Sequence, residues 1–327
     1  MTTITEENKR RALQSCITKT GPDGFPDPYR GKVRDVYNLT EELIGIVVTD
    51  RISAFDHIMK QAIPYKGQIL NRLSAFGFEN VEDILPTHVV DVPHPNVTIA
   101  KKCKTIPVEV VIRAYLTGHA WRTYKAGKRQ LCGVRLPDGM TEHQKFTKPV
   151  LTPATKAAEG HDEDISEADI LRRKMVSPQL WKEIRTKAFQ LFERGSAIAA
   201  AQGLLLVDTK YEFGLFDGEL ILIDEVHTSD SSRYFYAEGY EERLGNNEPQ
   251  KQLSKEFLRE WLMEQGFQGL ENQELPDLPD QFRWSIFQRY SELYETLTEK
   301  KFTPHPVTNF DRELKDVFSS YVQGKFR

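Results

Sequence analysis

The chain has 327 residues, with 44 Lys and Arg against 48 Asp and Glu, and a net charge of −4. This balance excludes a general nucleic-acid-binding protein, which would carry a surplus of basic residues. Three widely spaced cysteines without a C-x-x-C pair favour a reducing cytoplasm over a disulfide framework or a structural zinc site. No apolar run approaches the roughly 18 residues of a membrane span, so we expect a soluble cytoplasmic protein.

The first half of the chain alternates β-like segments with loops rich in proline and glycine. Residues 20–31 form such a loop, and the segments 32–39 and 42–50 have strand character. Residues 64–80 are mostly helical in pattern, whereas 108–113 is a strand that ends in arginine. A chain of this length suits two lobes around a cleft.

The second half begins with a long helix, for which Ser177 is the expected N-cap, Pro178 the first helical residue and Gly203 the stop signal. A charged hairpin follows at 208–226. Three further helices are expected at 254–265, 279–299 and 309–322.

These elements predict an α+β fold with three parts. Residues 1–105 would form a β-rich N-terminal lobe. Residues 106–240 would form a central α+β lobe, and 241–327 a helical region packed on that lobe.

The charged hairpin carries polar side chains where its apolar strands would otherwise pack into a core. Asp208, Lys210 and Glu212 alternate along the first strand and therefore share one face. A two-residue turn at Asp217-Gly218 would put Asp224 on the opposite face, whereas a three-residue loop would pair Lys210 with Asp224 and gather one cluster. Such a cluster suits a phosphate–magnesium site, because Mg²⁺ binds carboxylate and phosphate oxygens. The alternative is a hairpin with one solvated polar face.

Two N-terminal segments carry further candidates. In GKVRDVY, Lys32 and Arg34 point to the same side of a strand. This is not a Walker A loop, but a basic pair after a glycine-rich turn can hold nucleotide phosphates. In TDRISAFD, Ser53 and Asp56 follow a buried strand, where ligand contacts are common. The alternatives are a solvated strand face and a capping network.

Two arginines and their neighbours are candidate anion ligands. Arg113 ends an apolar strand, and a buried arginine needs an acidic partner or an anionic ligand. Gly118-His119 is a candidate helix start, whose amides can bind an anion. Arg233 follows two serines, with Asp230 nearby, and guanidinium and hydroxyl groups together bind phosphate.

A polar loop at 151–166 contains Lys156, His161 and Asp162, followed by Ser166 as an expected N-cap. The run from His161 to Asp164 has metal-binding residue types, but consecutive residues cannot all converge on one ion. Loops of this kind beside a cleft often act as lids. The alternative is a surface loop without a catalytic role.

Six segments in this order carry a family resemblance: GKVRDVY, TDRISAFD, PVEVVIRAYLTG, TPATKAAEGHDE, LVDTKYEFG and DEVHTSDSSRYF. Together they resemble the phosphoribosylaminoimidazole-succinocarboxamide synthase (SAICAR synthetase) family over about residues 29–262. The resemblance implies a SAICAR-synthetase-like fold, whose N-terminal ATP-binding lobe resembles the small lobe of a kinase. It implies an ATP-dependent ligase of de novo purine biosynthesis. Such an enzyme joins 5-amino-1-(5-phosphoribosyl)imidazole-4-carboxylate and L-aspartate into SAICAR, with release of ADP and phosphate.

The same resemblance implies a role for each candidate residue. Lys210, Glu212 and Asp224 would be catalytic, with Glu212 and Asp224 as ligands of the Mg²⁺ that accompanies ATP. Lys32 and Arg34 would hold the ATP phosphates together with Lys210. The substrate-binding residues would be Ser53, Asp56, Arg113, His119, Lys156, Asp162, Asp208, Asp230 and Arg233.

One position departs from the family: the chain has Gly118-His119 where many members have Gly-Ser, and that serine is a phosphate ligand. Either a ring N–H of His119 or the backbone amide would then supply the contact. Two other functions are a small-molecule kinase with the same ATP-binding lobe and a non-catalytic nucleotide sensor. The expected partners are the small-molecule substrates and, in a homo-oligomer, copies of the chain, with neither nucleic acid nor membrane.

Overall fold

The computed structural model of the chain describes residues 5–156 and 162–323, which fall into two compact units. The expectation for His161 therefore lies outside the described residues. Unit 1 comprises Met1–Ala75, His88–Lys102 and Phe257–Arg327, and unit 2 comprises Phe76–Thr87 and Cys103–Glu256.

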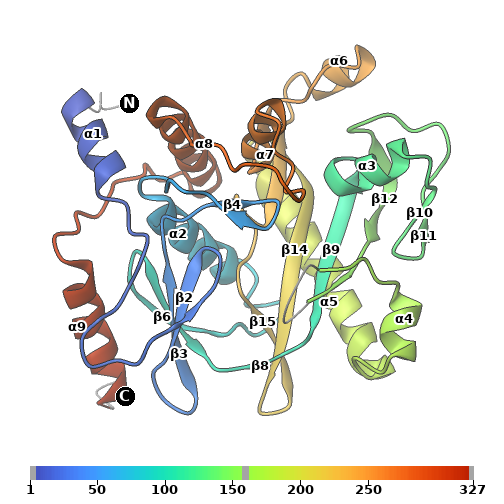
Figure 1. Cartoon of the computed structure of the whole chain (residues 1–327). Helices are drawn as coiled ribbons and strands as arrows, with labels where there is room; N and C mark the ends of the chain where they lie inside the picture. The colour runs from blue at the N-terminus through green and yellow to red at the C-terminus, as the bar shows by residue number, and fades with distance from the viewer. Residues whose placement is uncertain (1–4, 157–161, 324–327) are drawn as a thin grey trace. The chain divides into compact units, whose positions relative to one another are not determined.

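Unit 1 is built on a five-stranded antiparallel sheet in the order β1–β2–β3–β7–β6 (Figure 1). The alternation predicted for the second strand is present, since Asp35 and Tyr37 are buried while Arg34 and Val36 are only partly buried. A short hairpin, β4–β5, lies outside this sheet. The strands are β1 (Tyr29–Arg30), β2 (Arg34–Asn38), β3 (Leu43–Val48), β4 (Ser53–Ala54), β5 (His57–Ile58), β6 (Val89–His94) and β7 (Val97–Lys101).

Helix α9 (Phe310–Val322) completes the core of unit 1. Its Leu314 and Phe318 pack against Tyr37 in one buried cluster. A Cβ added at Gly45 of β3 would lie 2.5 Å from the Phe318 ring, so the helix approaches the strand closely at a glycine. Of the expected C-terminal region 241–327, residues 257–327 thus belong to unit 1 and 241–256 to unit 2. This differs from the expected helical part packed on the central lobe.

The remaining helices of the N- and C-terminal regions are α1 (Glu6–Gln14), α2 (Lys66–Glu79), α7 (Glu256–Glu264) and α8 (Asp280–Thr298). The boundary between the two units falls within α2 and after the first residue of α7. The helices expected at 64–80, 254–265, 279–299 and 309–322 are confirmed to within two residues at each end. Among the described residues, every helix is too short or too polar to span a bilayer.

Unit 2 is built on an eight-stranded sheet with β14 at its centre. The main order is β12–β9–β14–β16–β17, β13 pairs with β9, and β8 and β15 pair with β14. A separate pair, β10 (Gln130–Leu131) and β11 (Val134–Arg135), lies apart from it. The strands are β8 (Lys104–Thr105), β9 (Val108–Tyr115), β12 (Lys145–Leu151), β13 (Ala154–Thr155), β14 (Leu204–Phe216), β15 (Glu219–Ile223), β16 (Ser232–Tyr236) and β17 (Gln252–Leu253).

Helix α5 (Pro178–Ala201) contacts β14 and β9 along the sheet of unit 2 (Figure 1). Gly195 is the point of close approach, because a Cβ there would lie 2.3 Å from the ring of His227. The His227 ring in turn lies 2.6 Å from the hydroxyl of Tyr211 on β14. The buried histidine ring therefore explains why a glycine occupies this position in the helix.

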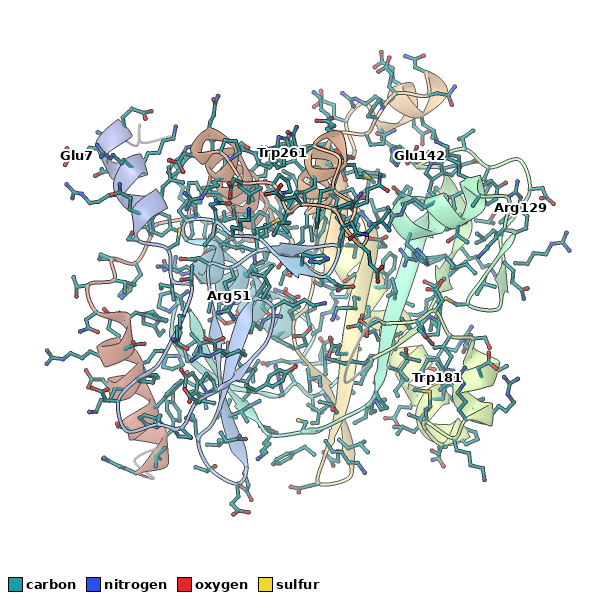
Figure 2. The ribbon with its side chains drawn as sticks, viewed as in Figure 1. Glu7, Arg51, Arg129, Glu142, Trp181 and Trp261 are labelled. Carbon is teal, nitrogen blue, oxygen red and sulfur yellow. The ribbon has the colours of Figure 1, made fainter. Side chains whose placement is uncertain are left out.

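The other helices of unit 2 are α3 (Gly118–Lys125), α4 (Glu167–Arg172) and α6 (Tyr240–Gly245). The predicted caps are confirmed, since Ser177 accepts the Leu180 N–H at 3.2 Å and Ser166 caps α4. Trp181, labelled in Figure 2, connects the two helices by donating to Glu167 at 2.8 Å.

The β14–β15 hairpin turns through two residues, Asp217 and Gly218, with Phe216 opposite Glu219. Both turn residues have positive φ, 53° and 82°, as a tight turn with right-handed strand twist requires. In this register Tyr211 faces Asp224, so strict alternation would turn the Asp224 carboxylate away from the charged face.

Asp224 nevertheless joins the charged face, with its Oδ2 3.1 Å from the Nζ of Lys210. It follows the last paired residue, Ile223, and has a φ of 70°, so the alternation of side chains stops there. Our expectation that the cluster requires a three-residue loop is wrong. A left-handed residue after a two-residue hairpin gives the same cluster.

Gly195→Ala is expected to destabilise unit 2 by about 1–3 kcal/mol, because the new methyl group overlaps the buried His227 ring. Gly245→Ala is the matched control, since that helical glycine has open space around it and alanine favours helix. Urea unfolding of both variants measures the difference. Equal midpoints for the two variants would contradict the close contact.

His227→Gln is expected to reduce the loss of stability in acid. Burial lowers the pKa of His227 to about 3 from 6.5. Between these values the unfolded chain holds a proton that the folded chain lacks, so stability falls as pH falls, by up to about 1.4 kcal/mol per pH unit. Urea unfolding between pH 7 and pH 4 should show the wild type falling more steeply than the variant. Parallel curves would mean that His227 takes up its proton in the folded chain.

Candidate functional site

Three neighbouring strands of unit 2 place an Arg–Asp–Arg row across the sheet. Asp208 on β14 lies opposite Arg113 on β9 and opposite Arg233 on β16. Residues directly opposite each other share a face, so the three side chains project to the same side. Asp208 Oδ2 accepts hydrogen bonds from Arg113 Nη1 at 2.9 Å and from Arg233 Nη1 at 2.5 Å. Three of the predicted substrate-binding residues are thus brought together.

A third arginine and a second carboxylate extend this row. Glu256, the first residue of α7, accepts a hydrogen bond from Arg233 Nη2 at 2.9 Å. The same carboxylate lies 3.5 Å from Arg122 Nη1 on α3. The guanidinium groups of Arg113, Arg122 and Arg233 thus gather around these carboxylates, and guanidinium groups are suited to bind a phosphate group. Sequence reasoning missed Glu256 and Arg122, since neither lies near Asp208 in the chain.

Burial opposes the charge on both central arginines. It lowers the pKa of Arg113, although the Asp208 carboxylate opposes this shift. Burial also acts to lower the pKa of Arg233, but the carboxylates of Asp208 and Glu256 outweigh it and raise that pKa. Both guanidinium groups remain charged throughout the physiological range.

Helix α3 begins directly at this row. Its first residue, Gly118, has a φ of 56°, and a Cβ there would lie 2.4 Å from the Arg233 guanidinium. Only glycine combines this backbone conformation with this approach. The next residue, His119, has its ring Nε2 2.7 Å from Asp164 Oδ2, and this bond lowers the pKa of Asp164. Asp164 is a partner for His119 that the sequence did not indicate.

A second cluster lies further along the same face of β14. Lys210 Nζ donates to Asp224 at 3.1 Å, to Glu109 at 3.2 Å and to Glu212. Lys156, just after β13, also pairs with Glu212. Glu109 was missed by sequence reasoning. Glu109 lies four residues before Arg113 on β9, so strand alternation puts both side chains on the same face. That spacing could have identified Glu109 from the sequence.

The electrostatics of this cluster fit a hard cation with phosphate. Burial raises the pKa of Glu109 to about 7, against the opposing charge of Lys210. Burial acts to lower the pKa of Lys210, but the carboxylates of Glu212, Asp224 and Glu109 raise it well above its usual value. The ammonium thus lies at the centre of an oxygen ligand set. Carboxylate oxygens around one positive charge are the donor set that Mg²⁺ takes.

The other predicted residues of unit 2 lie around these two groups. Asp230 is partly buried, and its Oδ2 lies 3.4 Å from Lys255 Nζ. Asp162 is exposed. Next to Asp162, the Glu163 carbonyl accepts the Thr155 N–H at 2.8 Å, and the Glu163 N–H donates to the Thr155 hydroxyl at 3.1 Å.

In unit 1, the predicted residues of the two N-terminal segments meet. Lys32, in the turn between β1 and β2, pairs with Asp56. Asp56 lies in the β4–β5 turn and has a φ of 64°. Ser53, at the start of β4, is buried, and Arg34 begins β2. The two segments GKVRDVY and TDRISAFD thus form one local group.

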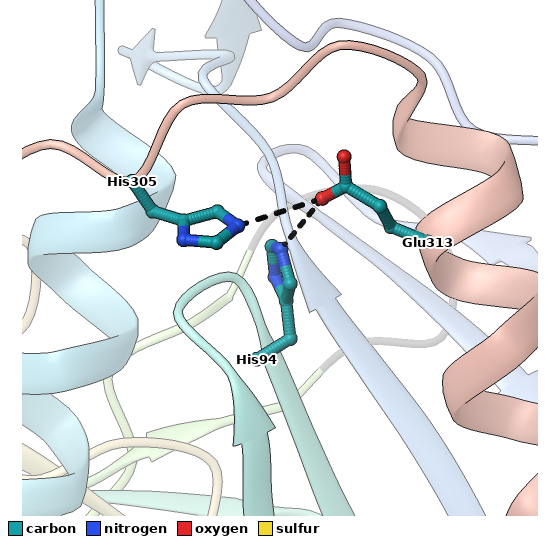
Figure 3. A group of neighbouring side chains, drawn as sticks. All are labelled: His94, His305 and Glu313. Atoms are coloured by element: carbon teal, nitrogen blue, oxygen red, sulfur yellow. Dashed lines mark hydrogen bonds and ion pairs between the residues drawn. The ribbon is translucent and has the colours of Figure 1, made fainter.

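A further group in unit 1 has metal-binding residue types: His94, His305 and Glu313 (Figure 3). Glu313 Oε2 lies 3.2 Å from His94 Nε2 and 3.6 Å from His305 Nε2. However, His94 Nδ1 accepts the backbone N–H of Asn96 at 3.0 Å, so the ring proton is on Nε2 and donates to Glu313. A metal needs the Nε2 lone pair. This group therefore fits a structural contact between β6 and α9 better than a metal centre.

Buried arginines beside a lysine–carboxylate cluster are typical of an enzyme that acts on phosphorylated substrates. Comparisons with known proteins identify the class more closely. A family profile described as SAICAR synthetase matches residues 27–274. The chain belongs to the SAICAR synthetase family.

Individual relatives agree with this assignment. A phosphoribosylaminoimidazole-succinocarboxamide synthase of Bacteroides thetaiotaomicron is 51% identical over 94% of this chain and 99% of its own length. One of Legionella pneumophila is 42% identical over 92% and 97%. Among solved structures, a SAICAR synthase of Saccharomyces cerevisiae in complex with SAICAR has a TM-score of 0.76 at 35% identity, covering 88% of this chain and all of that one. The SAICAR-synthetase-like α+β fold is confirmed.

Asp208→Asn is expected to destabilise unit 2 by about 3–5 kcal/mol, because it leaves two buried guanidinium groups without their shared carboxylate. Asp138→Asn is the control: Asp138 also has two arginine neighbours, but it is exposed, and such pairs contribute about 0–1 kcal/mol. Urea unfolding measures both. Equal losses would show that water screens the Asp208 row.

Proposed function

We propose which residues of this chain take part in each step of the family's reaction. The chain is an ATP-dependent ligase of purine biosynthesis (EC 6.3.2.6). It joins 5-amino-1-(5-phosphoribosyl)imidazole-4-carboxylate and L-aspartate to give SAICAR, ADP and phosphate. The main observation behind this proposal is that two groups of charged side chains lie along one face of β14. They are the arginine row at Asp208 and the cluster at Lys210.

The arginine row is proposed to bind the phosphate of the ribonucleotide. Arg113 and Arg233 are fixed by their shared bond to Asp208, so their remaining N–H groups are directed before the ligand arrives. Asp208 and Asp230 act in the substrate site by orienting basic neighbours. His119, held by Asp164, contributes through its backbone amide or the other ring nitrogen.

The cluster at Lys210 is proposed to receive the reacting end of ATP. Lys210 contacts phosphate, while Glu212 and Asp224 hold Mg²⁺, with Glu109 as a further oxygen nearby. When bound, Mg²⁺ neutralises part of the phosphate charge. Lys210 must exchange carboxylate partners for phosphate oxygens. Phosphate oxygens, like the carboxylates, favour the charged form of the ammonium.

The remaining residues complete the proposal. Lys32 and Arg34 hold ATP phosphates, and Ser53 and Asp56 contribute to the substrate site. Lys156 and Asp162 belong to the loop beside the reactants, with Lys156 already paired to Glu212. Mg²⁺ as the cation of ATP and a cytoplasmic location are parts of the same proposal.

The chemistry explains why these groups are needed. A carboxylate is a poor acyl donor, so transfer of the γ-phosphoryl group to it forms an acyl phosphate and releases ADP. The aspartate amine then attacks the acyl carbon, the amide bond forms, phosphate leaves, and the amine loses a proton. The protein contributes positioning and stabilisation of negative charge, for which buried lysine and arginine are suited.

ADP release over many turnovers is expected to require ATP-Mg, the carboxylated ribonucleotide and L-aspartate together, because the acyl phosphate stays in the site until the amine attacks it. Glu212→Gln should reduce kcat by about a hundredfold, because a buried charged group at the phosphates is lost. Glu219→Gln, an exposed change on the same hairpin, is the control and should leave kcat unchanged. Circular dichroism and urea unfolding verify that both variants fold.

Two results would contradict this proposal. ADP release that continues over many turnovers without aspartate would indicate phosphoryl transfer without ligation. A folded Glu212→Gln variant with wild-type kcat would remove the Lys210 cluster from the reaction.

A further inference from the structure

The turn between β1 and β2, residues 31–34, carries Lys32, and its backbone is held by Arg51. The Arg51 guanidinium donates from Nη2 to the Gly31 carbonyl at 3.0 Å and from Nε to the Lys32 carbonyl at 3.2 Å. Figure 2 shows Arg51 beside β2. One side chain thus fixes two successive peptide groups of the turn.

The other two carbonyls of the turn are also held within unit 1. Thr49 donates to the Val33 carbonyl from its amide at 3.0 Å and from its hydroxyl at 2.8 Å. The Gly31 amide donates to the Arg34 carbonyl at 2.8 Å. All four carbonyl oxygens of residues 31–34 therefore accept hydrogen bonds from the protein itself.

The direction of these carbonyls sets the direction of the amides. A trans peptide is planar, with its N–H opposite its C=O. Because the Gly31 and Lys32 carbonyls both point to Arg51, the N–H groups of Lys32 and Val33 both point away from it. Successive amides that point outward from a turn form a concave site for an anion. The lysine side chain of the same turn adds a positive charge.

Arg51 can do this because a buried carboxylate holds it in place. Its Nη2 also donates to Asp35 Oδ1 at 2.7 Å, and its Nη1 donates to the Thr18 carbonyl at 2.7 Å. Asp35 is fully buried, and its other oxygen accepts from Arg30 at 3.0 Å. The planar guanidinium supplies donors in several fixed directions, which a lysine ammonium cannot match.

We infer that Arg51 is a positioning residue, which orients the Lys32 and Val33 amides toward the phosphates of a nucleoside triphosphate. The inference rests on the proposed function, in which Lys32 holds the ATP phosphates. It adds that Arg51 holds the backbone of that turn in place. It also assigns Arg51 to maintaining the turn and not to contacting the ligand.

The test compares Arg51→Lys with Arg30→Gln. Arg51→Lys keeps a cation beside Asp35 but loses the bonds to the two carbonyls, so the KM for ATP should rise about tenfold. The kcat and the KM values for the ribonucleotide and aspartate should stay within about twofold. Arg30→Gln removes a cation from the same carboxylate without touching the turn carbonyls. It should lower the urea midpoint but leave the KM for ATP within about twofold.

Amide hydrogen exchange of Gly31 and Thr49, whose N–H groups donate to carbonyls of the turn in the ligand-free protein, gives a readout independent of activity. Arg51→Lys should accelerate exchange there, and Arg30→Gln should not. A folded Arg51→Lys variant with wild-type KM for ATP and wild-type exchange would overturn the inference. So would equal rises in the KM for ATP in both variants, which would assign the effect to Asp35.

The two hypotheses fail in different ways. If the wild type shows no ATP-dependent ligation, the proposed function is wrong. If ligation is normal and Arg51→Lys changes neither exchange nor the KM for ATP, only the role of Arg51 is wrong.

Discussion

The structure of unit 2 depends on one carboxylate. Asp208 lies at the centre of the sheet, where β9, β14 and β16 run side by side, and it is the common partner of two buried guanidinium groups. Removing charges from water is costly, and only a close opposite charge offsets that cost. The strand register and the position of Glu256 keep Arg113 and Arg233 paired with carboxylates. The glycine that begins α3 leaves space beside the Arg233 guanidinium, so that the arginines can also bind another anion.

Much of this arrangement could be predicted from the sequence, because it follows from local rules. Alternation along β14 placed Asp208, Lys210 and Glu212 on one face, and capping residues identified the starts of α4 and α5. Partners from distant parts of the chain could not be predicted. Glu109 and Glu256 join the site through strand pairing and helix placement, which no short pattern specifies. Asp224 joins it because its backbone is left-handed, a conformation that the regular alternation of a strand does not predict.

For the same reason, the sequence did not predict which unit the C-terminal helices belong to. The C-terminal helices were expected on the central lobe because they follow it in sequence. Their apolar stripes show only that a partner is needed, and they do not specify which sheet supplies it. The choice is made by complementarity of shape, as where Phe318 lies over Gly45 in the sheet of unit 1.

The order of residues in the two units has a consequence for synthesis on the ribosome. All of unit 2 lies before residue 257, so its strands can pair while the C-terminal helices are still being made. Unit 1 is assembled from both ends of the chain, and the core around Tyr37 lacks Leu314 and Phe318 until translation is nearly complete. During that interval the apolar face of the N-terminal sheet stays exposed. Truncation near the C-terminus should therefore affect the solubility of the nascent chain before it affects the chemistry.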